Sequence, residues 1–164
     1  MSRPLKRRPE EDGRHMRNRP AMGPPGRDIG DVLRTYAAVA LGSVIGSVLR
    51  ALVSLASIAL FGAGFPAGTL FVNIVGSFLI GFYATLTSPD GRIFASSRQR
   101  QFVMMGVCGG FTTFSTFSLD TLRLAQSGQL PTAGLNVGIS IVAWLAAVWV
   151  GHALASRLNR LRGS

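Results

Sequence analysis

Four long apolar runs constrain the fold of this 164-residue chain more than any other feature. They cover residues 36–61, 67–86, 101–126 and 132–156, and each holds at least 20 residues. A helix rises about 1.5 Å per residue, so about 20 apolar residues cross the roughly 30 Å hydrocarbon layer of a membrane. The runs lack the apolar–polar alternation of a membrane barrel. We therefore predict an all-α membrane protein with four transmembrane helices.

The connections between the runs are short, which predicts that sequential helices lie side by side and antiparallel. Residues 62–66 join the first two runs, a loop around residues 89–91 joins the middle pair, and residues 127–131 join the last two. Pairs of small residues four apart allow helix backbones to approach closely in lipid. We expect such packing at three glycine pairs: Gly42 and Gly46, Gly64 and Gly68, and Gly134 and Gly138.

The composition argues against a soluble enzyme. Hydrophobic residues make up 48% of the chain and charged residues only 15%, against roughly 25% charged in an average soluble protein. No nucleophile, base and orienting group occur together, so no enzymatic activity is expected. One cysteine and two histidines are too few for a disulfide framework or a zinc cluster. We assign Cys108 and His152 to packing.

The net charge of +10 is concentrated at the N-terminus rather than on one face of a domain, which disfavours a nucleic-acid partner. Nine of the 17 Lys and Arg residues lie within the first 34 residues, among several prolines. We predict a disordered basic tail over residues 1–30 and a four-helix transmembrane domain over residues 31–164. The tail is either a solvated arm that biases membrane insertion or a segment that binds a lipid surface or a partner.

The third run contains a sequence that is poor material for a lipid-facing helix. Gly109 and Gly110 are followed by Phe111, Thr112 and Thr113 in the middle of the run. We predict that the third helix is broken here at mid-membrane, because backbone groups freed at such a break often line a cavity and bind ions. The alternative is a kinked helix whose threonines hydrogen-bond to carbonyls four residues earlier.

Two further features of the runs have both a packing and an anion-binding interpretation. Phe111, Phe114 and Phe117 are spaced by three, so they are expected on one helical face beside Ser115. This stripe is either core packing or a row of positive ring edges that holds a partly dehydrated anion. Asn73 lies deep in the second run, where its carboxamide offers two donors to an anion or clamps two helices together.

These residues resemble a known family of small membrane proteins. The sequence Gly68-Thr69, Asn73 and Gly76 in the second run, together with residues 109–118 in the third, is similar to the Fluc or CrcB fluoride channels. The resemblance covers roughly residues 35–160. It implies an antiparallel, dual-topology homodimer that exports fluoride passively through two pores across the cytoplasmic (inner) membrane and limits fluoride toxicity.

The resemblance also implies roles for individual residues. The residues that it places along the anion path are Asn73, Phe114, Ser115, Thr116, Phe117 and Ser140. It places Arg50, Thr69 and Asp120 at a vestibule, although the family usually has a glutamate where Asp120 stands and a tyrosine where Asn136 stands. It further implies a structural sodium ion at the dimer centre, held by the carbonyls of Gly109 and Thr112 from both subunits.

Two other functions remain open at the level of sequence. A small proton-coupled exporter needs a carboxylate at mid-membrane, whereas Asp120 is near a helix end and Asp90 is in a loop. A non-transporting membrane scaffold would need no broken helix.

The distribution of positive charge predicts one orientation, with both termini in the cytoplasm. Arg123 is the only basic residue expected near the outer side, and Arg50 lies inside the first run. An antiparallel homodimer requires some copies to insert the other way, or else the partner is an inverted homologue.

Overall fold

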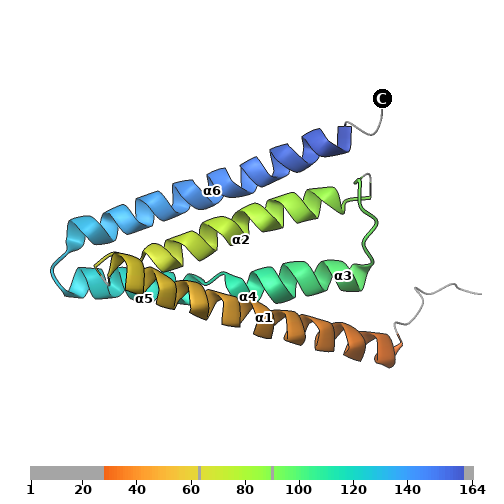
Figure 1. The fold of residues 1–164 in the computed structure, drawn as a ribbon, viewed down its shortest axis with the longest axis horizontal. Helices are drawn as coiled ribbons and strands as arrows, with labels where there is room; N and C mark the ends of the chain where they lie inside the picture. The colour runs from red at the N-terminus through yellow and green to blue at the C-terminus, as the bar shows by residue number, and fades with distance from the viewer. Residues whose placement is uncertain (1–27, 63, 90, 161–164) are drawn as a thin grey trace, which may run out of the picture.

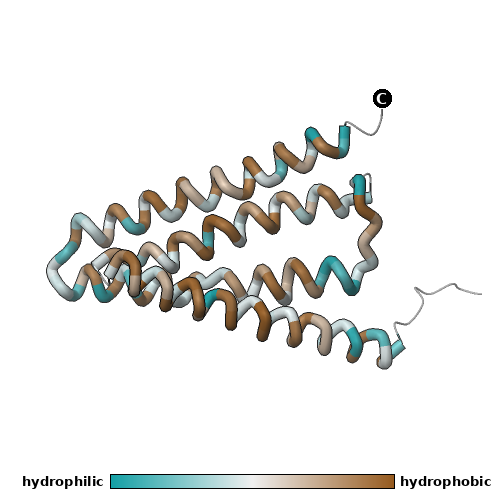
Figure 2. Tube along the Cα trace, viewed as in Figure 1, coloured by the Kyte–Doolittle hydropathy of each residue, from teal (hydrophilic) through white to brown (hydrophobic). Residues whose placement is uncertain are grey.

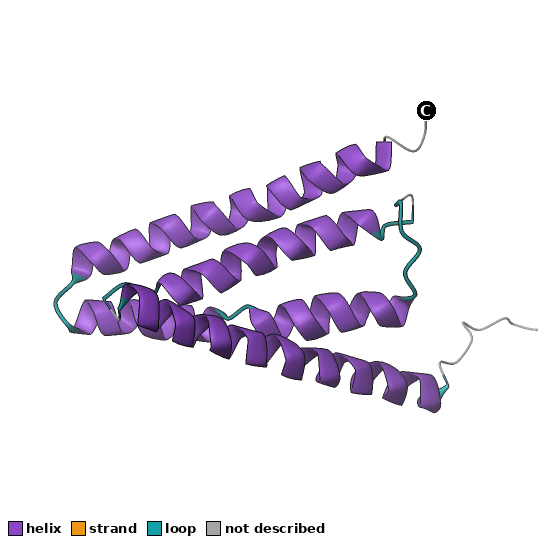
Figure 3. Ribbon diagram, viewed as in Figure 1, coloured by secondary structure: helices purple, strands orange, loops and turns teal. Residues whose placement is uncertain are grey.

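The computed structural model describes residues 28–62, 64–89 and 91–160, and all regular secondary structure in this part of the chain is helical (Figures 1 and 3). The helices are α1 (Ile29–Phe61), α2 (Ala67–Leu86), α3 (Ser97–Gln101), the π-helix η1 (Phe102–Cys108), α4 (Gly109–Phe111), α5 (Phe114–Gln126) and α6 (Leu130–Arg160). The segments α3, η1, α4 and α5 follow one another along a single span. Four spans are long and apolar enough to cross a membrane, so the prediction of a four-helix, multi-pass membrane protein is confirmed. Residues 1–27 of the predicted tail lie outside the described residues.

Consecutive spans run in opposite directions, as their short connections predicted (Figure 1). The start of α1, the connection between α2 and α3, and the end of α6 lie at one end of the molecule, which we call the terminal end. The α1–α2 and α5–α6 connections lie at the other end, called here the loop end. α2 packs along α6, and α1 packs against η1 and α4. The third span therefore contacts α1 with its first half and α6 with its second half, α5.

The distribution of side chains is that of a protein surrounded by lipid. Large apolar side chains are exposed along α1 and α6, among them Leu55, Leu60, Val142 and Leu145. Figure 2 shows hydrophobic positions, in brown, recurring along the length of both helices. The most completely buried side chains are those of Val72 and of two polar residues, Asn136 and Ser140. Polar groups thus lie between the helices, where they find partners that lipid does not offer.

Glycines set the distance between α1 and the third span. A Cβ atom at Gly42 would lie 2.7 Å from the carbonyl oxygen of Phe102, and one at Gly46 would overlap the carbonyl oxygen of Val107. The predicted close packing is therefore seen at this pair. In the second pair only Gly68 packs closely, against Ser57, and no atom of the described residues lies within 4 Å of a Cβ at Gly64. Around Gly134 and Gly138, in contrast, the described residues place no atom within 4 Å of such a Cβ, so they do not make the packing expected there.

Side-chain hydrogen bonds join α2, α6 and the middle connection at the terminal end. Asn159 donates to the carbonyl oxygen of Thr85 over 3.0 Å and accepts from the amide of Arg92 over 2.9 Å. His152, which we had assigned to packing, lies 2.8 Å from Thr85 Oγ1 through its Nδ1 atom. These contacts fix the end of α6 against the end of α2.

Candidate functional site

The third span holds two extended residues between helical segments. Thr112 has φ −82° and ψ 158°, and Thr113 has φ −153° and ψ 123°. Gly109 and Gly110 stay helical, so the interruption falls on the threonines. Thr112 Oγ1 also donates to the carbonyl oxygen of Cys108 over 3.0 Å, the back-bonding that the alternative of a kinked helix predicted. Thr112 thus has both features: its side chain bonds back to Cys108, and its own backbone is extended.

Asn73 of α2 holds this interruption with its carboxamide. Its Nδ2 atom donates to the carbonyl oxygen of Thr113 over 2.9 Å, and its Oδ1 atom accepts from the amide of Thr113 over 2.8 Å. Asn73 is only 5% exposed, so both hydrogen bonds are shielded from water. Of the two interpretations of Asn73, the geometry is that of a clamp between helices. One N–H group of the carboxamide remains for another acceptor.

The interruption releases carbonyl groups from the helical hydrogen-bond pattern. In a continuous helix the amide of Thr113 would donate to Gly109 O, but here it donates to Asn73. The amide of Thr116 would likewise donate to Thr112 O, but it donates to Thr113 Oγ1 over 3.1 Å and caps α5. Gly109 and Thr112 are the two residues whose carbonyls were predicted to bind sodium. Their carbonyls thus lack the amide that a continuous helix would supply.

The carbonyl of Gly110 is covered by two side chains of α1. Arg50 Nε donates to it over 3.1 Å and Ser47 Oγ over 3.4 Å. Arg50 was predicted at a vestibule, and the structure ties it to the interruption in the third span. This hydrogen bond places the delocalised positive charge of the Arg50 guanidinium group beside the same segment.

The expected single stripe of three phenylalanines is wrong. Phe111 ends α4 and is buried, whereas Phe114 and Phe117 belong to α5, because the two extended threonines rotate the chain between them. The rings of Phe114 and Phe117 are 5.6 Å apart. Phe114 is 72% exposed, and we call the surface around its ring the open side of the chain, whereas Phe117 is 8% exposed and packs against Trp144 of α6. The two rings thus lead from the open side into the space between α5 and α6.

Hydroxyl groups surround the start of α5. Thr113 Oγ1 lies 3.2 Å from Ser115 Oγ and donates to Thr116 Oγ1 over 3.0 Å. Ser115 is exposed, like its neighbour Phe114, and Thr116 is half-buried. The structure therefore brings Asn73, Phe114, Ser115, Thr116 and Phe117 together around the interruption.

Thr69 and Asp120 meet at the loop end, as the resemblance implied. Thr69 Oγ1 donates to Asp120 Oδ2 over 2.8 Å, so the aspartate reaches the threonine although its side chain is shorter than that of the usual glutamate. Both line a cavity of about 540 Å³ between α1, α2 and α5. Its other polar lining residues include Ser54, Ser57, Thr116, Arg123 and Gln129. Arg50 does not line this cavity, so the three predicted vestibule residues do not form one group.

Polar groups on α6 continue inward from the loop end. Asn136 Nδ2 donates to Thr121 Oγ1 over 2.8 Å, and Thr121 Oγ1 donates to the carbonyl oxygen of Phe117 over 2.8 Å. Ser140, one turn further along α6, is fully buried. The sequence analysis missed Thr121 and Trp144, although the four-residue spacing of Asn136, Ser140 and Trp144 places all three on one face of α6.

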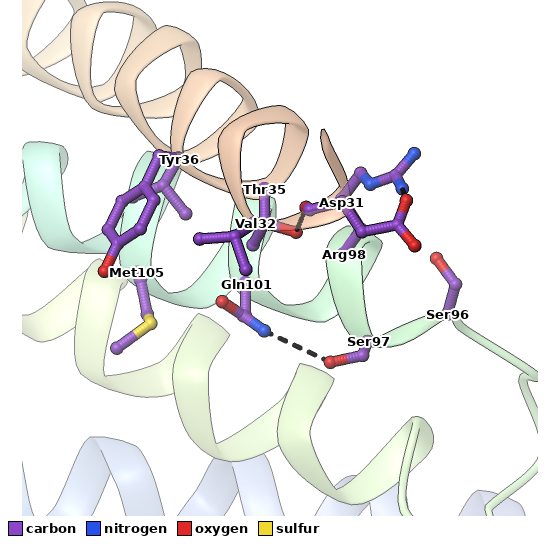
Figure 4. Close-up of a pocket in the computed structure, with 10 residues that line it drawn as sticks. Asp31, Val32, Thr35, Tyr36, Ser96, Ser97, Arg98, Gln101 and Met105 are labelled. Atoms are coloured by element: carbon purple, nitrogen blue, oxygen red, sulfur yellow. Dashed lines mark hydrogen bonds and ion pairs between the residues drawn. The ribbon is translucent and has the colours of Figure 1, made fainter. Parts of the chain in front are cut away.

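A second hollow of about 730 Å³ lies at the terminal end, between α1 and the start of the third span (Figure 4). Arg98 forms an ion pair with Asp31 over 3.2 Å, and Thr35 Oγ1 donates to the carbonyl oxygen of Asp31 over 2.8 Å. Gln101 donates to Ser97 Oγ on the other wall. This hollow was not predicted, and it reaches along η1 as far as Met105, so it does not include the interruption at Thr112 and Thr113.

The described residues contain no group of three or more His, Cys, Asp or Glu side chains able to hold a metal ion. A cation bound by this part of the chain would need other oxygen ligands, such as the carbonyls that the interruption releases. Carbonyl oxygen is a ligand suited to hard cations such as sodium.

Residues 37–152 match the family model described as CrcB-like protein, Camphor Resistance (CrcB). The chain belongs to the CrcB family. Its relatives include a fluoride-specific ion channel FluC 1 of Rhodopseudomonas palustris, 56% identical over 137 residues that cover 84% of this chain and 97% of the relative. Another is a fluoride-specific ion channel FluC of Paramagnetospirillum magneticum, 54% identical over 126 residues, 77% of this chain and 98% of the relative.

A CrcB relative of Opitutus terrae, also named fluoride-specific ion channel FluC, is 54% identical over 129 residues. The match to the CrcB family covers the interruption, the Asn73 clamp and the polar face of α6. The resemblance that the sequence motifs indicated is therefore confirmed for the whole of the four-helix part, apart from the ends of the outer helices.

Proposed function

We propose that this chain is a fluoride channel that lets fluoride leave the cell passively across the cytoplasmic membrane and so limits its toxicity. The observation that carries the proposal is the interruption at Thr112 and Thr113, where ring edges, hydroxyls and a carboxamide surround an extended backbone. These groups attract an anion without a fixed positive charge that would trap it. The names of the relatives point to fluoride as that anion.

The proposed anion path passes the two rings of α5, the exposed ring of Phe114 and the buried ring of Phe117. Phe114 and Phe117 offer ring edges, Ser115 and Thr116 offer hydroxyls, and Ser140 continues the path on α6. Asn73 has two tasks here, since it holds Thr113 in its extended conformation and keeps one N–H group for the anion. The cavity with Thr69 and Asp120 forms the proposed entrance at the loop end.

The proposed active form is an antiparallel homodimer in which a second copy covers the open side. Support comes from groups that the described residues leave largely uncovered: the exposed Phe114 ring, the exposed Gly109 backbone, and the open space around Gly134 and Gly138. An exposed apolar ring gains partners when another helix packs against it, and exposed glycines allow such a helix to approach closely. A two-fold axis through this side would bring both interruptions together.

A structural sodium ion fits the same arrangement. The carbonyls of Gly109 and Thr112 would hold it, and a two-fold axis would supply the same pair from the second copy. Such an ion would compensate for carbonyls that have lost their helical amide partners. The carbonyl of Gly110 is not a candidate ligand of the same kind, because Arg50 and Ser47 already donate to it.

The other functions have less support. A proton-coupled exporter needs a carboxylate that exchanges protons in mid-membrane, whereas Asp120 accepts a hydrogen bond from Thr69 near the loop end. A scaffold has no use for two extended residues inside a span. The relatives are named as channels rather than as enzymes.

Ion efflux from liposomes tests the proposal directly. The full chain is reconstituted into vesicles loaded with fluoride or with chloride, with no gradient other than that of the ion. We expect rapid fluoride efflux and much slower chloride efflux. Fluoride efflux equal to that of protein-free vesicles would overturn the proposed function.

A further inference from the structure

Two buried side-chain atoms on α6 have no hydrogen-bond partner, Ser140 Oγ and Trp144 Nε1, and no other such atom occurs among the residues that the structure describes. Ser140 is fully buried, and Trp144 follows one turn later on the same face of α6. Proteins pair the great majority of their buried polar atoms, and each exception needs a physical explanation. Two exceptions on neighbouring turns point to one shared ligand.

The chemistry of these two atoms selects a ligand that accepts hydrogen bonds. An indole N–H is a donor only, and a serine hydroxyl can also donate. α6 has no charged side chain before Arg157, so the helix itself offers neither a carboxylate acceptor nor a cation at this position. A small anion or a water molecule satisfies both donors, whereas a metal cation does not.

The position of Trp144 places this pair beside the proposed anion path. The indole ring meets the Phe117 ring edge-on, with centroids 4.9 Å apart and planes at 74°. Phe117 is the inner ring of the path, so Trp144 lies directly behind it. The two donors are closed to water in the chain, and an anion that reaches them has left its hydration shell.

We propose that Trp144 is a further permeation residue, whose indole N–H and the hydroxyl of Ser140 donate to dehydrated fluoride next to Phe117. This inference rests on the proposed function and adds a residue to its path. A hydrogen bond to an ion is stronger than one to a neutral acceptor, and fluoride is the halide with the most concentrated charge. The donors would therefore replace lost hydration better for fluoride than for chloride.

Substitution of the two tryptophans separates this role from a general effect of indole loss. Trp144→Phe keeps an aromatic ring and removes the N–H group. We expect fluoride efflux from liposomes to fall about tenfold, the factor that corresponds to about 1.4 kcal/mol. Trp149→Phe is the matched control, because Trp149 is 69% exposed on the outer surface of α6, and its efflux should be unchanged.

A shape-preserving variant covers the case in which Trp144→Phe disturbs packing. The chain has two tryptophans, so the Trp149→Phe protein has Trp144 alone. Incorporation of benzothienylalanine at this single position keeps the shape of indole but has sulfur in place of N–H. We expect the same loss of fluoride efflux. The fluorescence of Trp144 in the Trp149→Phe protein should also respond saturably to fluoride and not to chloride.

Unchanged efflux of Trp144→Phe would overturn the inference, as would normal efflux of the benzothienylalanine protein, since the N–H group would then be unnecessary. A fluorescence of Trp144 that is insensitive to fluoride would also overturn it, because the two donors would then hold a permanent water molecule. The proposed function is judged separately, on the fluoride efflux of the unaltered chain.

Discussion

Asn73 shows how one side chain determines the shape of a whole span. Its carboxamide satisfies both backbone groups of Thr113, which the extended conformation would otherwise leave buried and unpaired. Each such unpaired group costs about 1–3 kcal/mol. The interruption is therefore stable because Asn73 of α2 provides hydrogen-bond partners for the amide and the carbonyl of Thr113.

We expect Asn73→Ala to lower the melting temperature of the protein in detergent, with a loss of about 2–6 kcal/mol of folding free energy for the two groups. Asn73→Asp should not restore it, because a carboxylate cannot donate to the carbonyl of Thr113. The measurement is thermal unfolding followed by light scattering or size-exclusion chromatography. If Asn73→Ala unfolds at the temperature of the unaltered protein, Asn73 is a ligand for the anion and not a clamp.

The rings of α5 give a second prediction at this scale. Phe114→Ile and Phe117→Ile keep apolar bulk but lose the positive ring edge. We expect both proteins to fold while fluoride efflux falls about tenfold or more, the effect of about 1.4 kcal/mol. Phe94→Ile, in the exposed connection before α3, is the control and should conduct normally. Normal efflux from both α5 variants would identify the rings as ordinary packing.

At the level of residues, sequence reasoning found most of the side chains at the interruption but not their contacts. The motif of residues 109–118 and Asn73 were recognised from their types and spacing. The stripe over Phe111, Phe114 and Phe117 failed because a spacing of three assumes a continuous helix, and the threonines interrupt it. The bond from Arg50 to Gly110 was not foreseeable, since it depends on how α1 crosses the third span.

At the scale of helices, Gly46 controls the approach of α1 to the interruption. A Cβ there would overlap the carbonyl oxygen of Val107 and lie 2.7 Å from the amide nitrogen of Phe111. Both are backbone atoms that cannot move as a side chain does. The neighbouring α1 residues Ser47 and Arg50 would be displaced from Gly110 by the same shift.

We therefore expect Gly46→Ala to reduce both the yield of folded protein and its fluoride efflux at least severalfold. Gly64→Ala is the matched control, because no atom lies within 4 Å of a Cβ at Gly64. Yield is measured by size-exclusion chromatography and efflux from liposomes. Wild-type behaviour of Gly46→Ala would show that α1 packs against the third span less closely than described.

The four spans were predictable from hydropathy alone, since lipid allows few alternatives to a helix. The π-helix over Phe102–Cys108 could not be predicted from the sequence, because its residues have no pattern that distinguishes a π-helix from an α-helix. Its wider turn follows from contacts with α1, where Gly42 and Gly106 approach each other. Such a feature depends on tertiary packing and not on local sequence.

At the scale of the whole molecule, the sodium proposal predicts an ion-dependent dimer. A ligand that binds only the folded form raises its stability, by about 2.7 kcal/mol at 100 times the dissociation constant. We expect a higher melting temperature of the dimer in sodium chloride than in N-methylglucamine chloride of equal ionic strength. Equal melting temperatures in both salts would exclude a stabilising sodium ion.

The orientation of the chain gives the last prediction. The terminal end carries Arg34, Arg98, Arg100, Arg157 and Arg160, and the loop end carries Arg123, so charge favours a cytoplasmic terminal end. Ser164, beyond the described residues, is replaced by Cys in a Cys108→Ala background. We expect a sizeable fraction of chains to be labelled from outside intact cells, as an antiparallel homodimer requires.

Complete protection of the introduced cysteine, in cells where this chain alone restores fluoride export, would rule out that homodimer. Because these cells contain this chain alone and still export fluoride, an inverted homologue would not be required as a partner either.

The two extended threonines also divide one helical dipole into two. The carbonyl pole of the segment that ends at Phe111 faces the amide pole of α5, each equivalent to about half an elementary charge. Attraction for a cation and for an anion therefore arises side by side from peptide groups alone. Because this attraction belongs to the backbone, no exchange of a single side chain removes it as long as the interruption itself persists.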